Sequence, residues 1–92
     1  MQIDFTNKRI LVTGGTRGIG RAIVEAFLEA GACVAVNGST DETTDRALSE
    51  LNAGHMAVAA PGSVGSVAAC ELIVTAAVEG LGGLDVLVNN AG

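Results

Sequence analysis

The sequence predicts an α/β fold in which helices cover both faces of a parallel sheet. Strand and helix signals alternate along the 92 residues in the order βαβαβαβ. Apolar residues make up 49% of the chain, yet only two residues are aromatic, and short runs of Ala, Val, Leu and Ile are typical of strands buried on both faces. Strands joined through helices by short connections run parallel, with right-handed crossovers. We therefore expect half of a doubly wound sheet.

The expected elements follow one another without a linker. No low-complexity or Pro-rich stretch divides the chain, and its single proline lies between two apolar runs. In chain order we expect a strand over residues 9–13, a helix over 19–30, a strand over 33–37, a helix over 41–52, a strand over 56–60, a helix over 67–81 and a strand over 84–89. Residues 1–92 are thus expected to form one continuous unit.

The first expected helix has one apolar side. Ile19, Ile23, Phe27 and Ala30 recur at spacings of four, four and three residues, which places them on one helix face. Gly31 follows, and a glycine readily adopts the left-handed conformation that ends a helix. We expect this apolar face to pack against the sheet.

The other two helices carry recognisable start and stop signals. Ser39 and Glu42 have the spacing of a capping box, in which each side chain satisfies a backbone N–H of the other, and Gly54 is expected to end that helix. Ser66 is expected to cap the third helix, and Gly82 to end it. The expected apolar seam of the third helix consists of Val67, Cys70, Val74, Ala77 and Leu81.

Charge and composition exclude several classes of function. Five basic residues against ten acidic ones give a net charge of −5, which argues against binding to nucleic acid or to an anionic membrane surface. No apolar stretch has the length of a membrane span, and the first residues do not resemble a signal peptide, so we expect a cytoplasmic protein. Cys33 and Cys70 are expected to be small core residues, and His55 a surface residue, rather than metal ligands.

A glycine-rich turn joins the first strand to the first helix. Residues 13–20 read Thr-Gly-Gly-Thr-Arg-Gly-Ile-Gly, and such a turn directs free backbone N–H groups and the helix dipole at one point, where an anion can bind. Arg21 and Ala22 follow, where a phosphate-transferring P-loop needs Lys and Ser or Thr, so that alternative fails. A purely structural alternative is that the glycines only permit a tight turn and close packing of helix on strand.

Two motifs together resemble a known family. The run from Thr13 to Gly20 is similar to the cofactor motif of the short-chain dehydrogenases/reductases, and residues 84–92, Leu-Asp-Val-Leu-Val-Asn-Asn-Ala-Gly, are similar to the fourth strand of that family with its Asn-Asn-Ala-Gly ending. The resemblance runs through the whole chain but covers only the first part of such an enzyme. It implies a Rossmann-like fold in which residues 1–92 form a dinucleotide-binding segment that is incomplete.

The resemblance also implies which residues contact the dinucleotide. The pyrophosphate and the nearby ribose would be lined by Gly14, Thr16, Arg17, Gly18 and Ile19. The adenosine ribose and the nicotinamide side would be approached by Asn90, Ala91 and Gly92. Asn89 has two interpretations that remain open, a contact with the cofactor or a brace between adjacent strands.

The end of the second strand favours NADP over NAD. NAD-binding folds place an Asp or Glu there, about 20 residues beyond the glycine turn, to accept hydrogen bonds from the ribose 2′-OH. Here the residues are Asn37, Gly38 and Ser39, and the first carboxylate is Asp41 at the expected helix start. A 2′-phosphate could lie over Gly38 and receive hydrogen bonds from Ser39 and from the guanidinium of Arg17. The alternative is that Arg17 is only a solvated loop residue.

The residues after the third strand depart from the family pattern. The family commonly has Asp-Val there, and its aspartate accepts a hydrogen bond from the adenine amino group. This chain has Ser63 and Val64 at that point. A serine accepts such a bond more weakly than a carboxylate, so we expect looser recognition of adenine.

The catalytic residues of the family are missing from these 92 residues. The chain has no tyrosine, and its only lysine is Lys8, so the family's Tyr-x-x-x-Lys motif is absent. One hypothesis is that the chain is the N-terminal part of an NADP(H)-dependent oxidoreductase that reduces a carbonyl or oxidises an alcohol and forms a homo-oligomer. The wording of the glycine turn resembles that of 3-oxoacyl-thioester reductases, which implies such a substrate. The alternative is a stand-alone, non-catalytic module for nucleotide binding or assembly.

Overall fold

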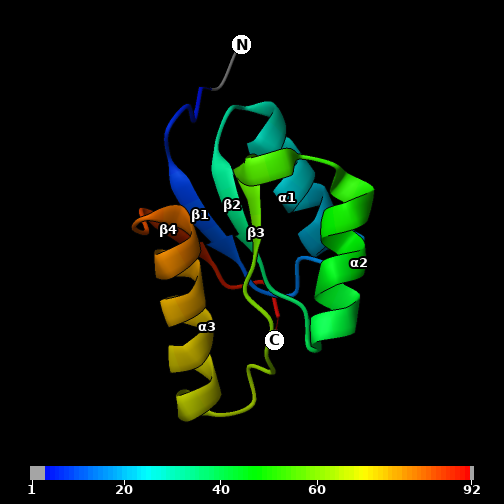
Figure 1. Ribbon diagram of the computed structural model, residues 1–92, viewed down its shortest axis with the longest axis vertical. Coiled ribbons are helices and arrows are strands. Elements are labelled where there is room, and N and C mark those ends of the chain that lie inside the picture. Colours follow the sequence, from blue (N-terminus) through cyan, green and yellow to red (C-terminus); the bar gives the residue numbers. More distant parts are fainter. Residues whose placement is uncertain (1–3, 92) are drawn as a thin grey trace.

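The computed structural model describes residues 4–91 and has the predicted α/β order. The elements are β1 (Arg9–Val12), α1 (Gly18–Glu29), β2 (Cys33–Val36), α2 (Asp41–Leu51), the 3-10 helix η1 (Gly54–Met56), β3 (Ala57–Ala59), α3 (Val67–Leu81) and β4 (Val86–Val88). Each expected strand and helix is present, although the strands are shorter than expected. The fold is Rossmann-like (Figure 1).

The four strands form one parallel sheet in the order β3-β2-β1-β4. The chain first moves outward from β1 to β3, and α3 then carries it back so that β4 lies on the other side of β1. The strand order therefore reverses between β1 and β4. In doubly wound sheets, ligands bind beyond the carboxyl ends of the strands at this point of reversal.

Alternate residues of the strands supply two apolar cores. Ile10 and Val12 of β1 face α1 and α2, whereas Leu11, between them, faces α3; all three are fully buried. Figure 1 shows α1 and α2 on one side of the sheet and α3 on the other. This alternation follows from the pleat of a strand, which directs successive side chains to opposite faces. The continuous apolar runs of the strands thus correctly predicted a sheet covered on both faces.

The apolar side expected for α1 is partly wrong. Ile23 and Phe27 pack against the core, but Ile19 is 75% exposed, and the buried residues of the helix are Gly20 and Val24. The first turn of α1 lies beyond the end of β1, where no strand side chain covers Ile19. Only Gly20, which has no side chain, is held closely against the turn that precedes the helix.

The start of α2 also differs from the expectation. Its N-cap is Thr40 rather than Ser39, and the capping box pairs Thr40 with Thr43 rather than Ser39 with Glu42. The helix ends at Leu51, and its C-cap Asn52 adopts the left-handed conformation (φ 49°). Asparagine tolerates this conformation better than most residues, so it replaces the expected glycine stop.

In α3 the caps are confirmed and the seam is partly wrong. The Ser66 hydroxyl accepts a hydrogen bond from the backbone N–H of Ala69, and Gly82 ends the helix in the left-handed conformation. Ala77 of the expected seam is buried, but the other buried residue is Ile73, which the seam did not include. Val67, a member of the expected seam, is 77% exposed. Leu11 and Ala35 offer α3 only a narrow apolar strip, so one row of helix residues is buried.

Candidate dinucleotide-binding site

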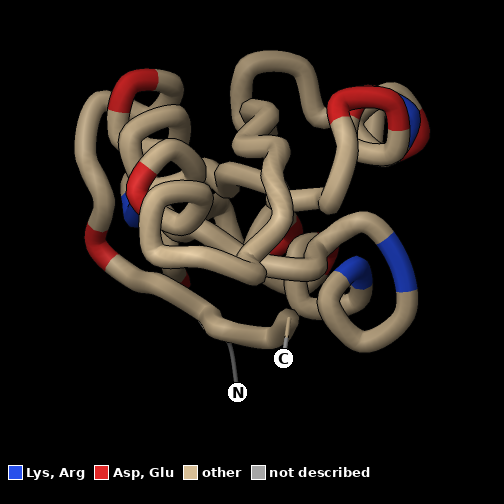
Figure 2. Tube along the Cα trace, turned by 90° about the horizontal axis from the view of Figure 1, so that it is seen from below, with Lys and Arg blue, Asp and Glu red and all other residues tan. Residues whose placement is uncertain are grey.

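A hollow of about 220 Å³ lies at the edge of the sheet where the parallel strands end. Its walls come from the segments that follow β1, β2, β3 and β4, which the parallel arrangement brings to the same edge. The lining residues are Gly14, Thr16, Arg17, Asn37, Gly38, Ser39, Gly62, Ser63, Val64 and Ala91. Figure 2 views the molecule from this edge. We call this hollow the strand-end hollow.

The glycines of the turn have three different tasks. Gly14 and Gly18 adopt left-handed backbone conformations, with φ of 62° and 59°, which other residues rarely adopt. A Cβ atom on Gly18 would meet nothing within 4 Å, so this residue faces open space. A Cβ atom on Gly20 would overlap the carbonyl oxygen of Gly14 and lie 2.6 Å from the side-chain nitrogen of Asn90. The turn therefore combines an open approach at Gly18 with tight packing at Gly20.

The first turn of α1 offers unsatisfied hydrogen-bond donors. Its N-cap is Arg17, whose side chain makes no capping hydrogen bond. By contrast, α2 and α3 are capped by Thr40 and Ser66. An uncapped helix start leaves backbone N–H groups and the positive end of the helix dipole free, and an anion is the group that fits there.

The side chain of Asn37 joins three segments of the strand-end hollow through hydrogen bonds. Its side-chain oxygen accepts a hydrogen bond from the backbone N–H of Gly14 at 3.1 Å. Its side-chain nitrogen donates to the carbonyl oxygens of Ala60 at 2.8 Å and Gly62 at 3.0 Å. The residue is only 2% exposed. Asn37 thus joins the glycine turn to the end of β3 and leaves little of its amide for a ligand.

Thr13 is a residue to which the sequence interpretation gave no role. Its hydroxyl oxygen accepts hydrogen bonds from the backbone N–H groups of Asn90 at 3.0 Å and Ala91 at 3.1 Å. Asn90 in turn donates from its side chain to the carbonyl oxygen of Gly14 at 3.2 Å. The hydroxyl of Thr13 also lies 3.3 Å from the side-chain oxygen of Asn89. A hydroxyl directly before a glycine turn was the available signal for this role.

Asn89 and Asn90 both brace β4 against the end of β1. The contact of Asn89 with Thr13 fits the bracing interpretation of that residue, and Asn90 contacts Gly14 from the same segment. Ala91 reaches the wall of the strand-end hollow. The predicted site residue Gly92 lies outside the described residues. The fourth strand therefore holds the glycine turn in place from the side opposite to Asn37.

The end of β2 is expected to meet the 2′ position of the adenosine ribose. No carboxylate is among the residues that line the strand-end hollow there. Ser39 and Arg17 are exposed there, and Gly38 is buried. A Cβ atom on Gly38 would lie 2.5 Å from Thr16 Cγ2 and from Thr44 Oγ1, so only glycine fits between the two segments. Within residues 4–91 Arg17 forms no ion pair.

Ser63 and Val64 line the strand-end hollow from the segment after β3. The backbone N–H of Gly62 donates to the carbonyl oxygen of Gly38 at 2.9 Å, which places this segment beside the end of β2. The hydroxyl oxygen of Ser63 accepts a hydrogen bond from the backbone N–H of Gly65 at 3.3 Å. Its proton is still available to an acceptor outside the chain.

The perturbed pKa values of the sheet belong to its opposite end. Hydrogen bonds from the Arg9 guanidinium, then from the Arg9 backbone N–H, lower the pKa of Asp85, with smaller contributions from the positive charges of Arg9 and Lys8. Arg9 Nε lies 3.1 Å from the carboxylate. In the part of the chain that the structure describes, no group of three or more His, Cys, Asp or Glu side chains could hold a metal ion. The strand-end hollow therefore offers backbone donors, hydroxyls and a guanidinium.

The structure brings nine of the thirteen predicted site residues to the wall of the strand-end hollow. Gly18, Ile19 and Asn90 lie beside it, in the first turn of α1 and after β4, and Gly62 is a lining residue that the sequence interpretation missed. The signal for Gly62 was its position directly before Ser63.

Among the described helices, none combines the length and apolar character needed to cross a membrane.

A family model described as short chain dehydrogenase matches residues 8–92. The chain belongs to this family. A 3alpha-hydroxysteroid dehydrogenase of Mediterraneibacter gnavus is 43% identical over 95 residues, which cover 100% of this chain and 38% of that protein. The short chain dehydrogenase family is a family of oxidoreductases, and this chain corresponds to its N-terminal portion.

Solved structures of short chain dehydrogenases share the fold. A Sinorhizobium meliloti protein provisionally classed as a short-chain alcohol dehydrogenase has a TM-score of 0.89 and 47% identity, covering 100% of this chain and 37% of that one. The RhlG/NADP active-site complex of Pseudomonas aeruginosa has a TM-score of 0.89 and 36% identity, covering 99% and 37% of the two chains. The chain thus spans 37–38% of the length of these three relatives.

Proposed function

We propose that this chain is the cofactor-binding part of an NADP(H)-dependent oxidoreductase that interconverts a carbonyl group and an alcohol. The strand-end hollow would receive the adenosine half of the dinucleotide, and the uncapped first turn of α1 would receive the pyrophosphate. When bound, the nicotinamide supplies or accepts the hydride. The residues of this chain bind and orient the dinucleotide.

The single observation that carries the choice of NADP(H) is the charge of the strand-end hollow. No carboxylate lines it among the described residues, so nothing there repels a 2′-phosphate or accepts a hydrogen bond from a 2′-OH as an acid would. Arg17 supplies a guanidinium at the wall, and Ser39 supplies a hydroxyl. The similar structure of RhlG, a complex with NADP, supports the same choice.

Titration of the purified protein with NADPH and with NADH tests this proposal. We expect NADPH to bind more tightly, and Arg17→Ala to weaken NADPH binding about tenfold and NADH binding by less, since only NADPH loses the charge-assisted contact with the 2′-phosphate. Lys8→Ala is the matched control, because it removes the same charge from the opposite end of β1. Tighter binding of NADH, or an unchanged NADPH affinity in Arg17→Ala, would contradict the proposal.

Several finer points remain proposals of the same kind. A 3-oxoacyl-thioester is the proposed substrate class, on the resemblance of the glycine turn alone. Apolar side chains on α3 and β4, such as Leu72 and Leu87, are exposed. They support a proposed homo-oligomer, because a second copy of the protein could cover them. A cytoplasmic location stays a prediction from the sequence.

A further inference from the structure

The arginines of the chain fall into two groups. Arg9 pairs with Asp85, and Arg21 pairs with Glu50 at 2.9 Å and with Glu25 at 3.6 Å. Arg17 and Arg46 form no ion pair with any residue between positions 4 and 91. Among the described residues, these two guanidinium groups therefore have no carboxylate oxygen within 4 Å.

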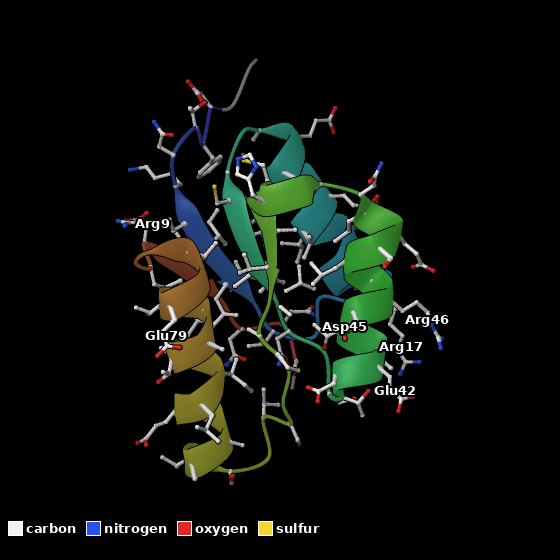
Figure 3. The ribbon with its side chains drawn as sticks, in the orientation of Figure 1. Arg9, Arg17, Glu42, Asp45, Arg46 and Glu79 are labelled. Carbon is white, nitrogen blue, oxygen red and sulfur yellow. The ribbon has the colours of Figure 1, made fainter. Side chains whose placement is uncertain are left out.

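Arg17 and Arg46 border one hollow between the start of α1 and α2. This second hollow has a volume of about 210 Å³. It is lined by Thr16, Arg17, Thr43, Arg46, Ala47 and Glu50. Figure 3 shows Arg17 and Arg46 on the same side of the molecule, beside α2. We call it the arginine hollow.

The arginine hollow continues from the strand-end hollow. Thr16 and Arg17 line both, so a group attached to an adenosine in the strand-end hollow could extend past them toward Arg46. The one carboxylate that lines the arginine hollow belongs to Glu50, and Arg21 holds it through the 2.9 Å ion pair. Its negative charge is thereby partly compensated from the side of α1.

We propose that Arg46 acts with Arg17 as a second cationic group for the 2′-phosphate of NADP(H). The proposal rests on the proposed function, because it concerns the same nucleotide. A dianionic phosphate is the group that two guanidiniums beside one hollow bind best, since each can donate paired hydrogen bonds. Arg46 lies on the exposed side of α2, where it costs the fold little and leaves its charge available.

Calorimetric titration with 2′,5′-ADP and with 5′-AMP tests Arg46 without any turnover. The two probes share the adenosine and differ in the 2′-phosphate. We expect Arg46→Ala to weaken 2′,5′-ADP binding about 3-fold to 10-fold, as for an exposed charge contact, and to leave 5′-AMP binding unchanged. Arg46→Lys should retain part of the affinity, because it keeps the charge but loses the paired donors.

The controls separate this inference from the proposed function. Lys8→Ala changes the net charge by the same amount as Arg46→Ala, at the other end of the sheet, and should not change either affinity. If Arg17→Ala weakens 2′,5′-ADP binding and Arg46→Ala does not, the role of Arg46 is wrong while the choice of NADP(H) stands. If the wild-type protein binds 5′-AMP as tightly as 2′,5′-ADP, both proposals are wrong.

Discussion

The hydroxyl oxygen of Thr13 lies 3.0 Å from the backbone nitrogen of Asn90, from which it accepts a hydrogen bond across 77 positions of sequence. The next N–H, that of Ala91, donates to the same oxygen at 3.1 Å. One side chain therefore satisfies two backbone donors at the point where β1 and β4 end. Through it the two motifs that resemble the short chain dehydrogenases form a single unit.

Replacing Thr13 by Val should uncouple these two motifs. The valine has nearly the same shape, but it leaves the N–H group of Ala91 without its acceptor and that of Asn90 with only the carbonyl oxygen of Val88, at 3.2 Å. We expect a loss of about 1–3 kcal/mol in the free energy of unfolding, measured by urea denaturation. Thr13→Ser keeps the hydroxyl and should lose less. Equal stability of Thr13→Val and the wild type would show that water replaces this contact at no cost.

Gly18→Ala should mainly weaken nucleotide binding, whereas Gly20→Ala should mainly lower stability. A Cβ atom on Gly20 would overlap the Gly14 carbonyl oxygen, so we expect Gly20→Ala to lower stability more than Gly18→Ala. At Gly18 the left-handed conformation costs roughly 1–2 kcal/mol, but space is open. The added methyl group should there mainly weaken nucleotide binding. Thermal unfolding and NADPH titration of both variants measure the pattern, and the reverse order of stability would contradict it.

The pair of Asp85 and Arg9 should contribute to stability in a pH-dependent way. Hydrogen bonds from Arg9 lower the pKa of Asp85 in the folded protein. A lowered pKa in the folded state stabilises the fold above the unfolded pKa, and this contribution is lost as the pH falls through the folded pKa. We therefore expect Asp85→Asn to be less stable than the wild type at pH 7 and the difference to shrink below about pH 4.

Urea denaturation of the wild type and of Asp85→Asn, at about four pH values between about pH 3 and 7, measures the difference in their free energies of unfolding. Hydrogen bonds from Thr6 also lower the pKa of Asp4. Because Asp4 is present in both proteins, its contribution cancels from the difference in stability. A stability difference that stayed constant over the whole range would show that the Asp85 carboxylate acts through packing and not through its charge.

The order of the elements could be predicted from the sequence because each signal is local. The alternation of apolar runs and capped helices needs no knowledge of contacts between distant residues, and the nine predicted residues in the strand-end hollow follow from the parallel sheet. The apolar side of α1 could not be predicted in the same way. Periodicity identifies one face of a helix, but it does not show how far the sheet extends beneath Ile19.

The start of α2 shows how tertiary contacts decide between two equal local signals. Ser39 and Thr40 are both good N-cap residues, and each is followed three positions later by a suitable partner. The buried hydroxyl of Thr44 donates to the carbonyl oxygen of Thr40 at 2.7 Å, and Gly38 lies tightly against Thr44 and Thr16. The contact with the glycine turn therefore fixes Thr40 as the cap, a contact that no local pattern contains.

Asn37 gives the sharpest test of why this chain lacks an acid at the end of β2. In Asn37→Asp one oxygen could still accept from the N–H of Gly14, but the other would face the carbonyl oxygens of Ala60 and Gly62, to which the amide now donates. A charged carboxylate would be repelled there. We expect a loss of at least about 1–3 kcal/mol in the free energy of unfolding at pH 7.5.

The loss in Asn37→Asp should decrease as the pH falls. Repulsion by the two carbonyl oxygens raises the pKa of the introduced carboxyl in the folded protein, because the protonated form can donate to one of them. A pKa that is raised in the folded state makes stability fall as the pH rises from the unfolded to the folded value. Asn37→Ala, which also loses the bridge but adds no carboxyl, should show a deficit that does not change with pH. If Asn37→Asp is as stable as the wild type at every pH, the amide of Asn37 is not the brace that excludes an acid from this position.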